Sequence, residues 1–572
     1  MLARLNVGTR ERSDDSFLTG RLPKMALRTL YQTLLDSDLA RLHVIARQWD
    51  IPLNTQRKPD VATELADAMP HAEAVERILA TLEDDARAAL DDLLRRGGAL
   101  PWAIFVRRWG ELRPAGPGRL EREALWREPA SPVERLWYLG LVQRAFATRP
   151  SGQVEMAFVP EELRLYMPVP VPLEITPPIA APAPSHQLVG TDVLADDLTT
   201  LFAVLQMETL KPLPADEWTA WLQLPQARPL LETLALEQGW LRRDEHGTVR
   251  LVPEATLKWL QADNWLQWTT LSRAWMESTH WNDLAAVPTL LPDPVRKWPA
   301  EPLSTRQAFL DLLRGCRPDT WYTLADFTAF VREHNLDFLR PDGDFDAWAL
   351  RDAATDKPLR GIEAWDAVEG AWIAFVLTGP LFWLGLVDLG GLAPTLPPTC
   401  FRLSGAGAAL LGLGNPPSLS DSSPLYLGED GSLQVPPRRR YVRFQVHRIA
   451  QPLGWNAGYR YRFTPGSLAL ARQQRIPPER IFTFLEEATG RAVPPHLRTA
   501  IERAYRSEAA ARLEHVWLLR VPDAAILDHP ALRRAIRERL NMHMALIHAT
   551  AREPVLRFLA HNGILPELTT DD

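Results

Sequence analysis

Arginine is the residue type most concentrated in one part of this chain, and its chemistry is the binding of oxyanions. Between Glu429 and Arg512 there are 15 arginines and seven acidic residues, a net charge of +8 within a chain whose net charge is −7. A guanidinium group presents a planar fork of N–H donors that matches phosphate and carboxylate oxygens. This uneven distribution points to a polyanion or an acidic partner.

The densest part of this stretch begins with three consecutive arginines and continues into alternating aromatic and basic residues. We expect these arginines to lie on one face of a strand and to bind phosphates, which supplies affinity but no sequence readout. A solvated or ion-paired surface is the alternative. The candidate nucleic-acid-binding residues here are Arg438, Arg439, Arg440, Arg443, Arg448, Arg460 and Arg462. A second candidate pair, Arg107 and Arg108, lies on a predicted helix.

Motifs for enzymatic chemistry are missing from the sequence. None of the six lysines follows a glycine, which excludes the P-loop of a nucleotide-driven motor, and no acid stands two residues before a lysine, as many nucleases require. Gly405 and Gly407 lack the third glycine of a dinucleotide fingerprint and predict a closely packed helix start. Asp342, Asp344 and Asp346 lack the glycine and glutamate of a calcium loop. We therefore predict no catalytic residue, no metal ligand and no cofactor.

Cysteine content and hydropathy indicate the compartment. Only Cys316 and Cys400 are present, which excludes a disulfide framework and fits a reducing environment. The N-terminus carries no apolar leader-like segment. The most apolar stretch, Ala371–Leu389, is interrupted by Gly379 and Pro380, so we predict buried core and no membrane span. We expect a cytoplasmic protein.

A local pattern recurs four times along the chain, and each copy has a short strand, then Pro or Ser, then a helix start. Thr464 and Ser404 are expected N-caps. In the first three copies a helix that ends at a glycine precedes the strand, which predicts a helix, a glycine stop and a β-hairpin. The four copies are Met156–Met167, Val249–Leu260, Cys400–Leu411 and Arg460–Ala471.

Two more helices precede this pattern in the first and third copies. They are predicted over Ala86–Arg96 and Pro101–Trp109, and over Arg306–Leu313 and Leu324–Glu333. Three helices followed by a hairpin is the plan of a winged helix, a helix-turn-helix with an added β-wing. Other packings of three helices and a hairpin remain open.

Both ends of the chain differ from this repeat. Near the N-terminus, Asp38–Trp49 and Pro59–Met69 resemble a SAP-type pair of helices, a small module that often binds DNA, and a plain helical hairpin is the alternative. At the C-terminus we predict two strands that pair in parallel or share a small sheet. The predicted order is strand His515–Val521, helix Ala524–Leu540, strand Met542–His548 and helix Arg552–Asn562.

The C-terminal block carries a family resemblance, through the segment Gly431–Pro437, the long segment Tyr459–Ala504 and the strand–helix–strand–helix end. From Ser432 to Leu568 the chain resembles the helicase-associated accessory domain of XPB-type helicases as found in bacterial proteins. In those helicases the domain precedes the motor and is linked to duplex engagement and partner docking. Because no motor follows here, the resemblance implies an accessory or regulatory role.

These observations predict a mainly α protein with small β-hairpins and a small α/β C-terminal unit, built as tandem winged-helix modules plus an XPB-accessory-like α+β domain. We expect a non-catalytic, DNA-binding accessory or regulatory protein. The alternative is a protein scaffold that docks a separate helicase, nuclease or transcription component without touching nucleic acid. The predicted parts are a tail (1–24), a helical module (25–75), a first winged helix (76–167), a proline-rich linker (168–188), a second (189–300) and a third winged helix (301–412), a linker (413–425) and the C-terminal domain (426–572).

Overall fold

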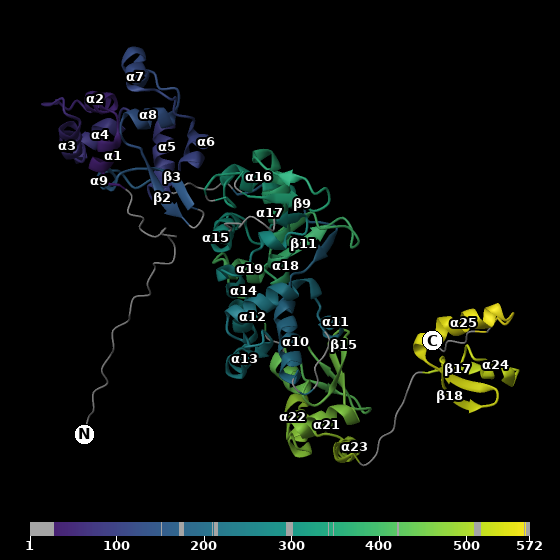
Figure 1. Cartoon of the computed structure of the whole chain (residues 1–572). Helices are drawn as coiled ribbons and strands as arrows, with labels where there is room; N and C mark the ends of the chain where they lie inside the picture. Colours follow the sequence, from purple (N-terminus) through teal and green to yellow (C-terminus); the bar gives the residue numbers. More distant parts are fainter. Residues whose placement is uncertain are drawn as a thin grey trace, which may run out of the picture. The chain divides into compact units, whose positions relative to one another are not determined.

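Helices predominate in this protein and its strands form small sheets, so the expected mainly α class with small β units is confirmed (Figure 1). The computed structural model describes residues 28–149, 152–170, 177–208, 210, 215–292, 301–340, 342–346, 348–419, 423–507, 516–565 and 567. The predicted tail, residues 1–24, lies outside the described residues. Contacts divide the chain into two compact units: residues 1–425, 434–448 and 452–460, and residues 426–433, 449–451 and 461–572.

The first predicted helix–hairpin repeat is present with one additional strand. The order is α5 (Asp84–Arg95), β1 (Ala99–Pro101), α6 (Trp102–Trp109), α7 (Pro117–Glu123), α8 (Pro132–Tyr138), β2 (Gln143–Arg149), β3 (Gly152–Phe158) and α9 (Glu161–Arg164). Strands β2 and β3 form the expected antiparallel hairpin, and β1 pairs with β3, which makes the sheet order β1-β3-β2. Both predicted helices are confirmed.

The third repeat has the same order of elements. It runs through α15 (Pro302–Leu313), β8 (Tyr322–Thr323), α16 (Leu324–His334), α17 (Ala371–Thr378), α18 (Pro380–Trp383), β11 (Val387–Gly391), β12 (Cys400–Leu403) and α19 (Gly405–Leu410). Again the short strand before the second helix pairs with the second strand of the hairpin. An insertion between α16 and α17 contributes β9 (Leu350–Asp352) and β10 (Pro358–Leu359), which form a sheet with β7 (Leu290–Pro292) in the order β10-β9-β7.

The second repeat is shorter in its strands. It contains α10 (Val193–Met207), α11 (Ala215–Thr219), α12 (Arg228–Glu237) and a two-stranded hairpin of β5 (Leu241–Arg243) and β6 (Val249–Leu251), followed by α13 (Pro253–Leu260) and α14 (Asn264–Glu277). Helix α10 is apolar over most of its length and lies inside the largest core cluster. The second and third repeats share that core, which joins Phe202, Trp268, Phe309 and Trp372.

Glycines end the last helix of each repeat, as the sequence predicts. Gly140, Gly239 and Gly385 have φ values of 71°, 71° and 72°, a left-handed conformation that glycine adopts without steric cost. The predicted N-caps are also confirmed, because the hydroxyls of Ser404 and Thr464 accept hydrogen bonds from Gly407 N at 2.9 Å and Ser467 N at 3.1 Å. Local sequence therefore sets the helix ends.

Part of the predicted proline-rich linker, residues 168–188, packs on the third repeat, while 171–176 lie outside the described residues. Ala181 N donates to Trp321 O at 2.7 Å, and β4 (His186–Leu188) adds an antiparallel strand beside β11. The sheet order becomes β4-β11-β12-β8. A Cβ atom on Gly390 would lie 2.2 Å from Pro184 Cγ, so this proline lies directly against the sheet. The described end of the segment is therefore part of a folded module.

From residue 28, where the described part of the chain begins, four helices precede the first repeat: α1 (Leu30–Asp36), α2 (Leu39–Gln48), α3 (Lys58–Ala68) and α4 (Ala72–Leu79). The predicted helix–loop–helix is present as α2, an extended segment and α3. These helices share one hydrophobic cluster with α5, α6 and α8, which includes Trp49, Leu65, Leu90 and Leu136. They therefore belong to the same core as the first repeat.

The C-terminal block contains β13 (Tyr426–Leu427), β14 (Ser432–Val435), α20 (Arg440–Val446), β15 (Gln451–Trp455), β16 (Tyr459–Arg462), α21 (Pro465–Gln473), α22 (Pro478–Thr489) and α23 (Pro495–Arg506). Its four strands form a sheet in the order β13-β14-β16-β15. Helices α21, α22 and α23 bury Leu468, Leu485 and Ile501.

The predicted helix over Ala524–Leu540 is wrong. The chain forms β17 (Trp517–Arg520), a short α24 (Ala524–Asp528), β18 (Ile536–Asn541), β19 (Met544–Ile547) and α25 (Arg552–His561). Pro530 disfavours helical geometry at the preceding residue, and His529 is extended at φ −63°, ψ 130°. All strand pairs are antiparallel in the order β17-β19-β18, so the parallel alternative is wrong and the small shared sheet is confirmed. Among the described residues, no helix is long and apolar enough to cross a membrane.

Candidate functional site

The predicted basic cluster lies on α20 and the turn before it, not on a strand. Arg438 is in the left-handed region at φ 66°, Arg440 begins α20, and Arg443 lies in the last turn of that helix. Arg440 and Arg443 are 1% and 2% exposed. Because α20 packs against α10, their side chains enter a region where α10 and the residue before its N-terminus supply two carboxylates, Asp192 and Asp196.

The guanidinium group of Arg440 donates hydrogen bonds to four side chains of this protein. Its Nη2 donates to Asp192 Oδ2 at 2.5 Å, its Nε donates to Asp196 Oδ1 at 3.1 Å, and its Nη1 donates to Gln267 Oε1 at 2.8 Å and Asn264 Oδ1 at 3.2 Å. Arg438 Nε also donates to Asp192 Oδ1 at 2.9 Å. Charge-assisted bonds of this kind are the strong ones. The group therefore holds α20, α10 and α14 together.

The electrostatics of this ion-pair group agree with its geometry. Burial raises the pKa of Asp192, but Arg440 and Arg438 outweigh burial and hold that pKa below its ordinary value. Burial lowers the pKa of Arg440, and Asp196 and Asp192 reverse that effect, so its pKa is raised. Each buried charge is stabilised in its ionised form by its partners.

The side chain of Arg443 also interacts with buried groups of the protein. Its Nη1 donates to Thr200 Oγ1 at 3.0 Å, its Nη2 donates to the carbonyl of Asp196, and its guanidinium lies 3.5 Å from the ring centroid of Tyr459. The Tyr459 hydroxyl accepts from Gln223 Nε2 at 2.8 Å, and burial raises its pKa. A phosphate group cannot reach Arg440 or Arg443 in this conformation.

A neighbouring carboxylate has no arginine bound to it. Asp197 is 0% exposed and accepts hydrogen bonds from Gln223 N at 2.9 Å and Leu224 N at 2.8 Å. Burial raises its pKa to about 6, although both backbone bonds oppose that change. Asp197 therefore fixes the turn before α12, and its raised pKa places its titration near pH 6.

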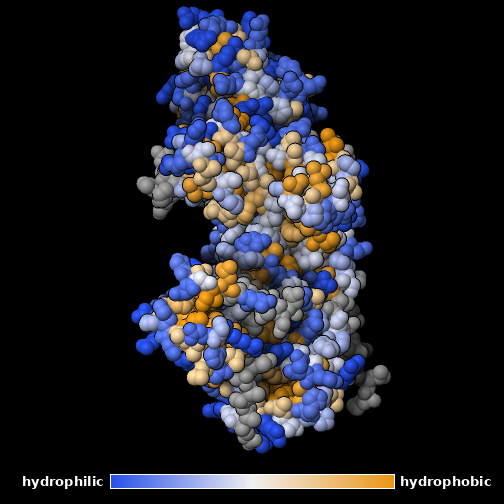
Figure 2. Space-filling view, turned by 90° about the vertical axis from the view of Figure 1, so that its right-hand side faces the viewer, coloured by the Kyte–Doolittle hydropathy of each residue, from blue (hydrophilic) through white to orange (hydrophobic). Residues whose placement is uncertain are grey.

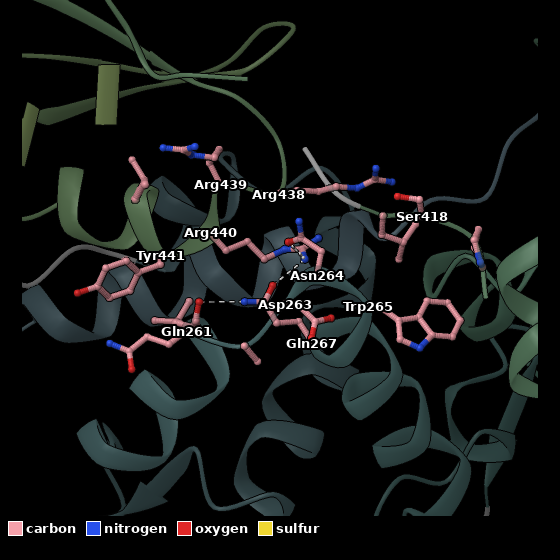
Figure 3. A pocket seen from close by; sticks show the side chains of 15 residues that line it. Gln261, Asp263, Asn264, Trp265, Gln267, Ser418, Arg438, Arg439, Arg440 and Tyr441 are labelled. Atoms are coloured by element: carbon pink, nitrogen blue, oxygen red, sulfur yellow. Dashed lines mark hydrogen bonds between the residues drawn. The ribbon is translucent and has the colours of Figure 1, made fainter. Parts of the chain in front are cut away.

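An open cavity of about 600 Å³ lies over the ion-pair group. Figure 3 shows the Arg440 side chain directed toward Asn264 and Gln267, whereas Arg439 points away from them. Arg438 is partly exposed, with 28% of its side chain accessible, but Asp192 neutralises it. The cavity is lined by residues 260–265, 267, 417–419 and 438–442. Its floor is polar and internally satisfied, so it offers few free donors to an anion.

The other predicted site residues lie apart from that cavity. On β16 the alternation is as expected: Tyr459 and Tyr461 are buried, and Arg460 and Arg462 are exposed. Arg462 Nη2 donates to Asp430 Oδ2 at 2.9 Å. Arg448 is half-buried and donates to Gln445 Oε1 at 3.2 Å.

Arg107 and Arg108 on α6 are occupied by contacts with other parts of the protein. Arg107 donates to the Asp337 carboxylate and to the carbonyl of Gly343, and Arg108 Nη1 donates to Asp92 Oδ2 at 3.2 Å. Burial raises the pKa of Asp337, opposed by both arginines. Arg107 therefore joins the first repeat to the insertion of the third, whereas the ion pair of Arg108 lies within the first repeat.

Helices α21 to α23 and the turns between them carry six exposed arginines that were not among the predicted site residues, and Arg462 on β16, which was predicted, adjoins them. Between residues 461 and 507, seven arginines are exposed and only two acidic residues, Glu479 and Glu487, are exposed with them. We call these seven the basic helical surface. The local charge of +8 was the signal that could have found them. They are Arg462, Arg472, Arg475, Arg480, Arg491, Arg503 and Arg506.

The last helix of each repeat, where a helix-turn-helix protein would read DNA, is enclosed. No residue of α8 or α18 is exposed, nor is any residue of α17, which directly precedes α18, and in α12 only Pro229 is exposed. Helix α17, with the sequence AWIAFVLT, has no polar side chain except that of Thr378. Their polar side chains are at most partly exposed, and Arg228 is paired with Glu232, so these helices offer few donors or acceptors to a DNA groove.

The arrangement of possible metal ligands and the burial of the two cysteines can be compared with the sequence predictions. No group of three or more His, Cys, Asp or Glu side chains within the described ranges could hold a metal ion. Cys316 and Cys400 are buried, and burial raises the pKa of both thiols. Comparison of the chain with protein-family models and with curated proteins finds no match.

Proposed function

We propose that this chain is a non-catalytic accessory protein that binds the DNA backbone through the basic helical surface. The observation that carries the proposal is the excess of exposed arginines over exposed acids on α21 to α23 and the turns between them, where six arginines and two acids are exposed; Arg462 on the adjoining strand is paired with Asp430. Guanidinium groups on a surface of this kind bind phosphates and release counterions, with no sequence readout. The resemblance to the accessory domain of XPB-type helicases, within which these helices lie, favours the same role.

We also propose that the three repeats are winged-helix modules. In the first and third, the order helix, strand, helix, helix, hairpin and the pairing of the short strand with the second hairpin strand support this assignment. Because their last helices are enclosed, we assign these modules an architectural role. DNA contact then belongs to the basic helical surface, and the partner would be a helicase, nuclease or transcription component in the bacterial cytoplasm.

The test is binding of a labelled random-sequence duplex by the full chain, followed by fluorescence anisotropy. Arg475→Gln, Arg480→Gln and Arg491→Gln together remove three exposed charges, and we expect an affinity loss of roughly tenfold or more. The matched control removes three exposed charges elsewhere, through Arg314→Gln, Arg332→Gln and Arg351→Gln. Equal losses in both triple variants would contradict a contact on α21 to α23.

A second candidate function is a protein scaffold without nucleic-acid contact. Large apolar side chains reach the surface, including Phe146, Leu165 and Leu392 at 69%, 76% and 75% exposure. On the face shown in Figure 2, apolar residues form several separate patches between hydrophilic ones. Exposed apolar patches mark protein partners. The scaffold would be favoured by two results together. The chain captures the same helicase or nuclease partner from lysate whether or not the nucleic acid has been digested, and the purified chain does not bind duplex DNA.

A further inference from the structure

A second cavity, of about 420 Å³, lies in the N-terminal part of the molecule and is independent of the proposed DNA contact. It is bounded by the end of α1, the start of α2, the loop after α6, helix α8 and strand β2. Its apolar wall is formed by Leu112, Pro114, Ala115, Pro117 and Leu120. Its polar wall contains Arg41, which comes from α2 and is 5% exposed.

Arg41 is a buried cation without a carboxylate partner. Among the described residues no carboxylate oxygen lies within 4.0 Å of its guanidinium, and its Nε has no hydrogen-bond partner. Every group that it does bond is neutral: Ser37 Oγ at 2.6 Å, Gln143 Oε1 at 3.1 Å, and the carbonyls of Trp137 at 3.0 Å and Val142 at 3.5 Å. It lies 3.5 Å from the ring centroid of Trp137.

This arrangement differs from the Arg440 group, where two carboxylates balance the buried charge. Burying an ion without a counter-ion costs several kcal/mol, and the cost shows in the pKa of Arg41, which burial lowers to about 9. The charge of Arg144 lowers that pKa further, while the Tyr138 hydroxyl and Asp38 raise it. A buried positive charge facing a cavity is the arrangement expected of an anion site.

The other charged groups at the cavity are already paired or exposed. Arg113 binds the buried carboxylate of Glu134, with Nε–Oε2 at 2.9 Å, and Arg144 Nε donates to Glu155 Oε1 at 2.9 Å. Asp36 and Asp38 also line the cavity, but both are exposed, so water weakens their interaction with Arg41, and Asp38 is the smallest of the named influences on its pKa. The buried guanidinium therefore keeps an unmatched charge of one.

We propose that this cavity binds the carboxylate of a small organic acid, with the apolar part of the acid against Leu112, Pro114 and Leu120. A carboxylate carries the single negative charge that balances the buried Arg41, which now bonds only neutral groups. A phosphate at neutral pH would bring more charge than the site leaves unmatched. The volume suits an acid with one ring or a short chain.

The test is isothermal titration of the full chain with phenylbutyrate, with phenylbutyramide as the uncharged match and with inorganic phosphate. We expect saturable one-to-one binding of phenylbutyrate, and binding of the amide and of phosphate weaker by roughly tenfold or more. Equal binding of acid and amide, tighter binding of phosphate, or no binding of phenylbutyrate at millimolar concentration would overturn the proposal.

Two variants locate the binding. Arg41→Met removes the buried charge and should abolish the preference for acid over amide. Arg144→Glu places a negative charge at the rim, so it should weaken binding of the acid several-fold; because it also breaks the partly exposed ion pair with Glu155, urea unfolding must show that this variant is folded. If Arg41→Met fails to fold, Arg144→Glu carries the test alone. Binding of the acid unchanged in a folded variant of either kind would refute the site. Duplex DNA binding should be unchanged in Arg144→Glu, so failure here is distinguishable from failure of the proposed function.

Discussion

Replacing Arg440 with methionine tests whether the predicted basic cluster is structural. Methionine keeps a flexible apolar stem of similar reach and removes the guanidinium. Arg440 is fully buried and donates five hydrogen bonds, to Asp192, Asp196, Asn264 and Gln267. If this arginine served as a phosphate contact, its loss would cost DNA affinity and little stability.

The expected cost follows from the groups that lose their partner. Asp192 keeps Arg438, but Asp196, 3% exposed, keeps only the backbone N–H of Arg438 at 3.3 Å. Removing one partner of a buried ion pair costs about 3 to 5 kcal/mol, because the other charge stays buried and unpaired. That is a large fraction of the roughly 5 to 15 kcal/mol that stabilise a folded protein.

Urea unfolding followed by tryptophan fluorescence measures this cost. The matched control is Arg460→Gln, an exposed arginine of the same charge cluster, which should change the free energy of unfolding by less than about 0.5 kcal/mol. Combining Arg440→Met with Asp196→Asn removes both the cation and its orphaned partner. The double variant should be more stable than the sum of the single losses predicts, by about 0.5 to 3 kcal/mol.

The reasoning is refuted if Arg440→Met unfolds within about 1 kcal/mol of the unchanged protein, since a cost of that size is that of an ordinary substitution. It is equally refuted if the single losses simply add in the double variant. If Arg440→Met is folded and as stable as the unchanged protein but no longer binds duplex DNA, then Arg440 contacts DNA after all.

Three further predictions concern groups elsewhere in the fold. Asp197, whose pKa is raised to about 6, is protonated more readily when folded than when unfolded, so its ionisation costs about 3 kcal/mol of stability above pH 6 and nothing below about pH 4. The unchanged protein should therefore gain stability relative to Asp197→Asn as pH falls from about 6 to about 4 in urea titrations; a constant difference would show that the group does not titrate there. Cys316 and Cys400 should react with a thiol reagent only after unfolding, because both are buried and burial raises the pKa of Cys316 to about 12; rapid reaction of the native protein would contradict this. A Cβ at Gly407 would lie 2.0 Å from Leu386 O, so Gly407→Ala should destabilise by about 1 to 3 kcal/mol. Gly405→Ala meets nothing within 4 Å and should be neutral or stabilising by up to about 1 kcal/mol, and thermal unfolding that ranks the two glycines alike would contradict the close packing.

Features encoded within a few residues could be predicted from the sequence. The glycine stops at Gly140, Gly239 and Gly385 and the caps at Ser404 and Thr464 depend only on local backbone geometry. The three hairpins follow from the same local signals. The C-terminal error was also local: Leu532, Ile536 and Leu540 have helical spacing, but Pro530 forces an extended residue before it.

Features that depend on distant parts of the chain could not be predicted. Arg440 and Asp192 are 248 positions apart in sequence, so no local pattern indicates that they form an ion pair. The same holds for Arg107 and Asp337, which are 230 positions apart. Arg475, in the turn after α21, and Arg480, on α22, became candidates only because the fold exposes them and buries Arg440 and Arg443. The composition shows which segment carries the positive charge, but only the tertiary fold shows which of its arginines are exposed to a partner.

The salt dependence of duplex binding by the full chain tests the proposed function most directly. Each phosphate contact contributes about −0.9 to the slope of log affinity against log salt, so use of about three arginines of the basic helical surface gives a slope near −3. Our account predicts that value or a steeper one, reduced by about one for each arginine removed from this surface. Duplex affinity that stays constant as salt is raised, or no affinity at low salt, would contradict it.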